Sequence, residues 1–171
     1  MGKIHIYCGD GKGKTTAAIG LSVRATGQGY KVIFVQFLKT SPTGELQIFE
    51  KIDDIEVVRS EKPMKFTFLM NEQELEECRK INCNMLEQVL QREFTAQTLL
   101  VLDESIGSIH ADVLDEEKVL EFLGSKPMCE VVLTGRNPSD ALVNMADYVT
   151  EMKKIKHPYD YAVDARRGIE F

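Results

Sequence analysis

Residues 4–16 read IHIYCGDGKGKTT, and this stretch decides how the rest of the chain is interpreted. A strand-like run comes first, a loop with three glycines follows, and a helix rich in small residues begins after the Lys-Thr pair. Glycines let backbone N–H groups turn inward around phosphate oxygens, and a helix N-terminus adds a favourable dipole. Lys14 supplies a point charge and Thr15 a hydroxyl for Mg²⁺. The stretch favours a nucleotide phosphate loop over a merely structural turn.

Short β-branched runs alternate with longer helical patterns along the rest of the chain. The predicted strands cover residues 3–7, 31–37, 55–59, 99–103, 131–134 and 148–151, and the predicted helices cover 15–25, 44–51, 71–93, 115–123 and 139–145. Asn71 and Glu74 are typical of a capping box at the start of the third helix. Runs that are apolar on successive residues, such as 99–102, indicate a parallel sheet covered by helices on both faces. We expect one α/β domain over residues 1–171, with the tail from Lys153 packed on it.

Two carboxylates end one of the apolar strands. Residues 99–104 read LLVLDE, which places Asp103 and Glu104 at a strand end where one or both could hold Mg²⁺ or its waters beside the phosphate loop. The alternative is that Asp103 caps the following helix and Glu104 is solvated. Together, loop and acids predict a P-loop NTPase-like (RecA-like) three-layer sandwich with a mostly parallel sheet. Kinases, ATPases and transferases share this apparatus, so it does not select a reaction.

Composition excludes several classes of protein. Acidic residues number 27 and basic residues 21, so the formal net charge of −6 disfavours binding to a nucleic-acid backbone. No apolar run approaches the roughly 20 residues that span a bilayer, and the start lacks a signal-peptide pattern, so we expect a cytoplasmic protein. The four cysteines form no C-x-x-C pair, which argues against a structural zinc site.

Further motifs resemble those of the ATP:corrinoid adenosyltransferases, also called cob(I)alamin or cob(I)yrinic acid a,c-diamide adenosyltransferases. The resemblance is nearly full length and includes the order and spacing of the motifs. The phosphate loop has three residues between its first glycine and the Gly-Lys-Thr triplet, where P-loops usually have four. The other marks are Arg24, VQFLK at 35–39, FTF at 66–68, VLDE at 101–104, TGR at 134–136 and KH at 156–157.

The resemblance implies that Co(I) of a corrinoid attacks the 5′ carbon of ATP, forms a carbon–cobalt bond and expels triphosphate. No general base is needed, so the protein aligns the reactants and stabilises the charge on the departing triphosphate. ATP and the corrinoid are the implied substrates, with Mg²⁺ on the phosphates. A flavoprotein or another reductant and a homodimeric assembly are also implied.

The same resemblance assigns roles to particular residues. Lys14, Thr15 and Glu104 are the implied catalytic residues, and Thr15, Asp103 and Glu104 are the implied Mg²⁺ ligands. The implied nucleotide contacts are Arg24 and Arg136, and the implied corrinoid contacts are Phe66 and Phe68. The implied phosphate cradle consists of Gly9, Asp10, Gly11, Lys12, Gly13, Lys14, Thr15 and Thr16.

Other interpretations of these residues stay open. Arg136 could be an ordinary surface arginine, and two phenylalanines in a loop are more often part of a core. The whole protein could be a P-loop ATPase or small-molecule kinase that produces ADP, or a non-catalytic carrier of adenosylcobalamin. Two residues depart from the family pattern: Asp10 stands where asparagine is common, and Phe68 where tryptophan is common.

Overall fold

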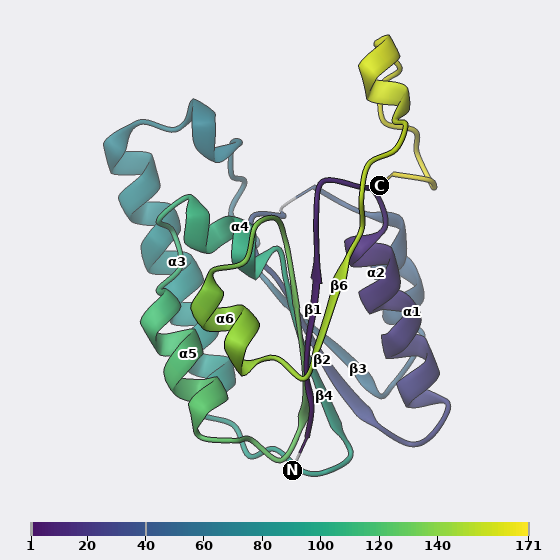
Figure 1. The fold of residues 1–171 in the computed structure, drawn as a ribbon, viewed down its shortest axis with the longest axis vertical. Helices are drawn as coiled ribbons and strands as arrows, with labels where there is room; N and C mark the ends of the chain where they lie inside the picture. The colour runs from purple at the N-terminus through teal and green to yellow at the C-terminus, as the bar shows by residue number, and fades with distance from the viewer. Residues whose placement is uncertain (1, 40, 171) are drawn as a thin grey trace.

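The computed structural model describes residues 2–39 and 41–170, in which strands and helices largely alternate (Figure 1). The strands are β1 (Ile4–Cys8), β2 (Lys31–Gln36), β3 (Ile55–Arg59), β4 (Thr98–Asp103), β5 (Glu130–Thr134) and β6 (Tyr148–Glu151). The helices are α1 (Lys14–Thr26), α2 (Gly44–Phe49), α3 (Glu72–Leu90), α4 (Ser105–His110), α5 (Glu116–Gly124) and α6 (Asp140–Met145), with short 3₁₀ helices η1 (Thr67–Leu69) and η2 (Pro158–Tyr161).

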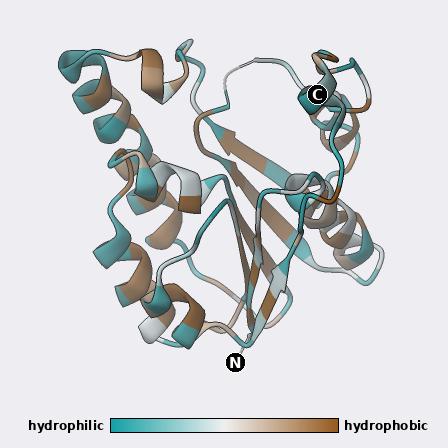
Figure 2. Cartoon of the chain, turned by 45° about the horizontal axis from the view of Figure 1, so that its top comes forward, coloured by the Kyte–Doolittle hydropathy of each residue, from teal (hydrophilic) through white to brown (hydrophobic). Residues whose placement is uncertain are grey.

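The strands form one sheet in the order β3-β2-β4-β5-β1-β6, and every pairing between neighbours is parallel. All six residues of β4 are buried, so this strand is covered on both faces. Figure 2 shows the hydrophobic colour concentrated in the strands at the centre of the molecule. The expected parallel sheet is confirmed.

Helices form a layer on each face of the sheet, with α1 and α2 on one side and α3 to α6 on the other (Figure 1). Each layer has its own apolar cluster. Phe34 of β2 packs on Phe49 of α2 in one cluster, with ring centroids 5.2 Å apart, whereas Leu86 of α3 and Leu123 of α5 belong to the other. Burying a side chain of this size contributes roughly 1.5–3 kcal/mol to folding. The predicted three-layer sandwich is therefore observed.

The helix ends show one confirmed detail and one element that the sequence pattern missed. At the start of α3, Asn71 Oδ1 accepts from the backbone N–H of Glu74, and Glu74 Oε2 accepts from that of Asn71, which confirms the capping box. Helix α4 was not predicted, because it begins one residue after β4, without a connecting loop or a side-chain cap to mark its start. No helix within residues 2–39 and 41–170 has the length and apolar character to cross a bilayer.

The C-terminal tail does not pack on the domain, so that prediction was wrong. Residues 153–156 and 158–169 are all exposed, with Ile155 at 86% and Tyr159 at 77%. Charged residues interrupt every apolar stretch of this segment, so no continuous apolar face is available for burial. Both ends of the described tail contact the domain: the N–H of Lys154 donates to Asp10 Oδ1 at 2.9 Å, and Glu170 forms an ion pair with Lys12 at 3.3 Å.

Gly20 lies exposed in the interior of α1, and no atom lies within 4 Å of the Cβ that alanine would add. We expect Gly20→Ala to raise the free energy of unfolding by roughly 0.5–1 kcal/mol, because alanine loses less backbone entropy in a helix than glycine. Urea unfolding followed by circular dichroism measures this change. A lower unfolding midpoint in the variant would contradict the open space seen around this position.

Candidate active site

The phosphate loop connects β1 to α1 at the carboxyl edge of the sheet. Gly9 and Gly13 have backbone φ angles of +105° and +117°, a region that favours glycine. The ammonium group of Lys14 folds over the loop and donates to the carbonyl oxygens of Gly9 and Gly11, each at 2.8 Å. Burial, followed by the nearby positive charge of Arg136, lowers the pKa of Lys14. The loop thus concentrates positive charge at one point, as a phosphate site requires.

The chain beyond β6 lies against this loop. Met152 donates its N–H to the carbonyl of Cys8 at 2.8 Å and accepts from the N–H of Gly11 at 2.6 Å. A Cβ on Gly9 would lie 2.4 Å from the Met152 carbonyl oxygen, and one on Gly11 would lie 2.6 Å from it. These two glycines therefore admit a neighbouring backbone, a role that the sequence pattern did not indicate.

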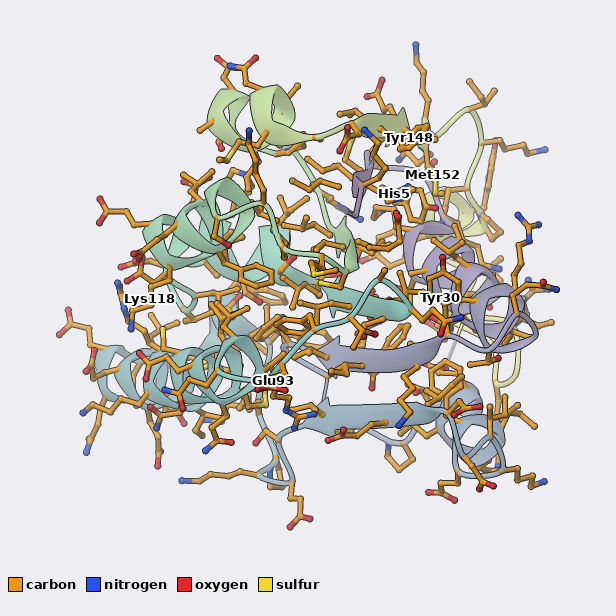
Figure 3. All side chains as sticks on the ribbon, turned by 90° about the horizontal axis from the view of Figure 1, so that it is seen from below. His5, Tyr30, Glu93, Lys118, Tyr148 and Met152 are labelled. Atoms are coloured by element: carbon orange, nitrogen blue, oxygen red, sulfur yellow. The ribbon has the colours of Figure 1, made fainter. Side chains whose placement is uncertain are left out.

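Edge strand β6 is held in register by its contact with β1. His5 and Tyr148 stack with ring centroids 4.7 Å apart and planes 14° from parallel, and Figure 3 shows them near Met152. The other side of the imidazole interacts with Glu130, whose Oε2 lies 2.9 Å from Nε2. This stacking helps to fix where β6 ends, and so where Met152 meets the phosphate loop.

Asp103 lies at the end of β4, is fully buried, and connects three other segments of the chain. Its Oδ1 accepts from the hydroxyls of Thr15 at 2.9 Å and Thr134 at 2.7 Å. Its Oδ2 accepts from the ammonium of Lys39 at 2.6 Å, and the same ammonium lies 3.0 Å from Thr15 Oγ1. Asp103 does not cap helix α4, so the helix-capping alternative was wrong.

Glu104 follows in a left-handed backbone conformation, with φ 60° and ψ 18°, and its N–H donates to the hydroxyl of Thr134 at 2.8 Å. Its side chain folds over Gly107, where an added Cβ would lie 2.3 Å from Oε1. Burial and the adjacent charge of Asp103 raise the pKa of Glu104, while Lys39, among other cations, opposes this. Glu104 is thus a partly shielded carboxylate beside the phosphate loop and not a solvated one.

The two arginines predicted to contact the nucleotide lie at different distances from the phosphate loop. Arg136 is exposed, but it lies close enough to contribute to the lowered pKa values of Asp10 and Lys14 and to oppose the rise in the pKa of Glu104. Arg24 lies in the last turn of α1, about 13 Å along the helix axis from Thr15 at 1.5 Å per residue.

Asp10 and Lys12 face the tail. Asp10 Oδ1 accepts from the N–H of Lys154 at 2.9 Å, and this bond is the main reason that the pKa of Asp10 is lowered. Lys12 pairs with Glu170, whose pKa falls to about 2, chiefly through its hydrogen bonds to Arg166. Both loop side chains are thus engaged with residues beyond β6, and their contacts to phosphate stay a prediction.

Phe66 and Phe68 are exposed by 71% and 79%, so the core alternative was wrong. Their rings stack 5.4 Å apart and within 13° of parallel, in the loop that follows β3. Exposed, mutually stacked rings present a flat apolar surface, and such surfaces in monomers usually mark binding sites.

A cavity of about 760 Å³ connects these features, within the size range of small-molecule sites. Its lining comes from the start of α1, the segment after β2, the loop after β3 and the end of the tail, and it includes Thr15, Thr16, Lys39, Glu45, Phe66, Leu69, Ile169 and Glu170. The end of the phosphate loop and the ring of Phe66 therefore line the same cavity.

Sequence reasoning assigned no role to several residues of this site. Lys39 and Thr134 occur in the quoted VQFLK and TGR motifs, yet their contacts to Asp103 depend on β2 and β5 being the neighbours of β4. Gln36 is almost fully buried; it donates to Glu45 at 3.0 Å and accepts from Arg59 at 3.2 Å, which positions Glu45 at the cavity. A buried polar residue at the end of a strand was the available signal.

Comparison with known proteins decides which of the P-loop classes this chain represents. The sequence model of the family described as ATP:corrinoid adenosyltransferase BtuR/CobO/CobP matches residues 1–171. This chain belongs to that family. It is 32% identical over 172 residues to the corrinoid adenosyltransferase of Escherichia coli K12, covering 99% of this chain and 86% of that protein. Against the corrinoid adenosyltransferase CobA of Salmonella typhimurium LT2 the identity is 34% over 175 residues, again with 99% and 86% coverage.

A third member of the adenosyltransferase family, the corrinoid adenosyltransferase of Pseudomonas aeruginosa, is 32% identical over 173 residues, which cover 99% of this chain and 84% of that protein. The resemblance inferred from the short phosphate loop and its companion motifs is thus confirmed over the full length of the sequence.

Proposed function

We propose that this chain transfers the 5′-deoxyadenosyl group of ATP to Co(I) of a corrinoid, cobalamin or cobyrinic acid diamide, and releases triphosphate. The observation that carries the proposal is the family match over residues 1–171. The cavity supports it, because Thr15 and Thr16 line it from the phosphate loop while Phe66 lines it from the loop after β3. A triphosphate and the apolar face of a macrocycle would each find a suitable surface there.

The residues around Asp103 suit Mg²⁺. Hydroxyl and carboxylate oxygens of Thr15 and Asp103 lie 2.9 Å apart, with the Glu104 carboxylate following Asp103, and such oxygens are the ligands that Mg²⁺ prefers. Within residues 2–39 and 41–170 no three His, Cys, Asp or Glu side chains gather into a metal cluster. A small number of protein ligands is typical of a Mg²⁺ ion that also binds the phosphates of a substrate. Mg²⁺ held there would neutralise charge on the triphosphate.

The chain's own contribution to the reaction is charge and alignment. Co(I) is itself a strong nucleophile, so no side chain has to remove a proton. The triphosphate gains negative charge as its bond to C5′ breaks, and preorganised cations and N–H groups stabilise that charge in the transition state. The ammonium of Lys14 lies over the phosphate loop, and Arg136 is close enough to lower the pKa of Lys14, so both charges are available to the phosphates. The corrinoid contacts of Phe66 and Phe68 align the cobalt with C5′.

The product of the reaction tests the proposal directly. The protein is incubated anaerobically and in the dark with Mg-ATP and chemically reduced cob(I)alamin, while absorption spectra are recorded and the phosphate product is identified. Light-sensitive adenosylcobalamin with equimolar triphosphate is the expected result. ADP in place of triphosphate would indicate an ATPase or kinase, and tight binding of adenosylcobalamin without turnover would indicate a carrier.

Replacing Phe66 or Phe68 with alanine tests the corrinoid surface. We propose that these rings pack below the macrocycle and exclude the lower axial ligand of the cobalt. Loss of that ligand raises the Co(II)/Co(I) reduction potential, so that a biological reductant can reduce Co(II) to Co(I). Each variant should lose at least about tenfold in rate when the reaction starts from Co(II) and a protein or flavin reductant. With chemically supplied Co(I) its rate should stay close to wild type.

Tyr159→Ala is the matched control: Phe66 lines the cavity and Phe68 stacks on Phe66, whereas Tyr159 is a comparably exposed aromatic residue of the tail that is not among the lining residues. The side chains of Phe66 and Phe68 are exposed, so both variants should keep the wild-type unfolding temperature. If chemically supplied Co(I) fails to rescue the phenylalanine variants, their assignment to the reduction step is wrong.

Finer features of the function rest on family resemblance alone. We propose that a flavoprotein or another reductant supplies the electron, that the protein acts in the cytoplasm, and that its functional form is a homodimer of a single domain. Sedimentation or light scattering measures the assembly, and a purified flavodoxin-type reductant assayed with Co(II) tests the electron donor.

A further inference from the structure

The ammonium group of Lys39 occupies the centre of the buried polar cluster. It lies 2.6 Å from Asp103 Oδ2 and 3.0 Å from Thr15 Oγ1, while Thr15 itself donates to Asp103 Oδ1. The Asp103 side chain has no exposed surface, so a carboxylate there requires a cation beside it. Lys39 supplies that cation.

The proposed function assigns Thr15 Oγ1 and the Asp103 carboxylate to Mg²⁺, and Lys39 contacts that same hydroxyl and the second oxygen, Oδ2, of that carboxylate. A Mg²⁺ ion binds oxygen at about 2.1 Å and demands near-octahedral geometry. An ammonium group in hydrogen-bond contact with both the Thr15 hydroxyl and the Asp103 carboxylate cannot keep its place when the ion binds to these groups, because two cations would then lie within one contact distance of each other. The Glu104 carboxylate is a third oxygen-bearing group, besides those of Thr15 and Asp103, that lies close enough to Lys39 to interact with its charge.

The cavity offers the Lys39 side chain a second position. Its side chain is 26% exposed and lines the cavity, so the flexible stem reaches from the buried cluster into the space beside Thr16. A lysine ammonium is a compact charge on a long stem with three donors, suited to exchange one anionic partner for another. The triphosphate of a nucleotide in the same cavity is such a partner.

We propose that Lys39 and a divalent cation compete for one position between Thr15 and Asp103, and that binding of the metal–triphosphate moves the ammonium onto the phosphate oxygens. Lys39 thus serves as a tethered counter-ion for Asp103 and afterwards as a binding charge for the leaving triphosphate. The inference rests on the proposed function for the identity of the metal–triphosphate ligand. No change in the backbone is required.

Lys39→Met tests this exchange, because methionine keeps most of the length of lysine without its charge. Mn²⁺, used as the probe for the divalent site, should bind the variant without nucleotide at least about tenfold more tightly than wild type, measured by calorimetry or electron paramagnetic resonance. Inorganic tripolyphosphate with Mg²⁺ should bind at least about tenfold more weakly. Equal Mn²⁺ affinity in both proteins, or no Mn²⁺ binding in either, would overturn the proposal.

A second measurement uses the wild-type protein and does not depend on the variant's folding. Acetylation of lysines is followed by mass spectrometry, with the exposed Lys31 at the start of β2 as the internal control. Mn²⁺ alone should increase the acetylation of Lys39, and Mg²⁺ with tripolyphosphate should decrease it, whereas Lys31 stays unchanged. If neither addition alters Lys39, the exchange does not occur.

Neither measurement contains a corrinoid, so its result is independent of adenosyl transfer. Failure of the exchange with normal production of adenosylcobalamin would remove this inference and leave the proposed function in place. Exchange without adenosylcobalamin production would do the reverse.

Discussion

Replacing Lys14 with alanine lowers the rate of adenosyl transfer at least about 10³-fold while the fold remains intact. Removal of one preorganised group that stabilises developing charge commonly costs 10²- to 10³-fold in kcat, and Lys14 also contributes a full charge at the centre of the loop. The lost hydrogen bonds to the carbonyls of Gly9 and Gly11 cost about 1 kcal/mol of stability each, which a domain of this size tolerates.

A single-turnover assay with chemically generated cob(I)alamin and saturating Mg-ATP measures this loss without interference from the reduction step. Thermal unfolding followed by circular dichroism checks that the variant is folded. Lys31→Ala is the matched control, because Lys31 is an exposed lysine at the start of β2, at the opposite edge of the sheet from the phosphate loop. A Lys14→Ala enzyme with more than a tenth of the wild-type rate would contradict the assigned role.

Gly9→Ala should be the most destabilising of the substitutions considered, with a loss of about 2–5 kcal/mol in the free energy of unfolding. Two causes add. The backbone φ of +105° is strained for alanine, and the new Cβ would lie 2.4 Å from the carbonyl oxygen of Met152, a backbone atom that cannot rotate away. The chain beyond β6 must then separate from the phosphate loop, and nucleotide affinity falls with stability.

Thermal and urea unfolding measure this effect, and a decrease of about 5–15 °C in Tm is expected for a domain of this length. Gly20→Ala is the matched control, since the same substitution in open space should raise stability. If Gly9→Ala unfolds at the wild-type temperature, then Met152 does not lie against the loop as described, and the glycine serves the phosphate alone.

Much of the fold follows from local patterns in the sequence. All six strands were predicted to within one residue at each end, because short runs rich in β-branched residues are typical of strands. The capping box at Asn71 and Glu74 and the phosphate loop were equally legible, since each depends on residues a few positions apart. Helix α4 was missed because it starts one residue after β4, with no side-chain cap to mark its beginning, whereas α6, of the same length, begins at the cap residue Ser139.

The tail shows the limit of composition as a guide. Its aromatic residues suggested burial, yet Tyr159 and Tyr161 are exposed, because burial requires an apolar face and the neighbouring charges prevent one. Conversely, the backbone of Met152 packs on the phosphate loop through carbonyl and N–H groups, which every residue type carries. No pattern of side chains could have indicated that contact.

By itself, the sequence determined the class of fold, the phosphate loop, the acid pair and the family, since these depend on local spacing and on motifs kept in order. The tertiary structure alone decided that Thr15, Lys39 and Thr134 meet at Asp103. That meeting depends on the strand order, in which β2 and β5 flank β4 although α3 and other elements separate them along the chain. Strand order is set by how the helices cover both faces of the whole sheet, and no single strand encodes it.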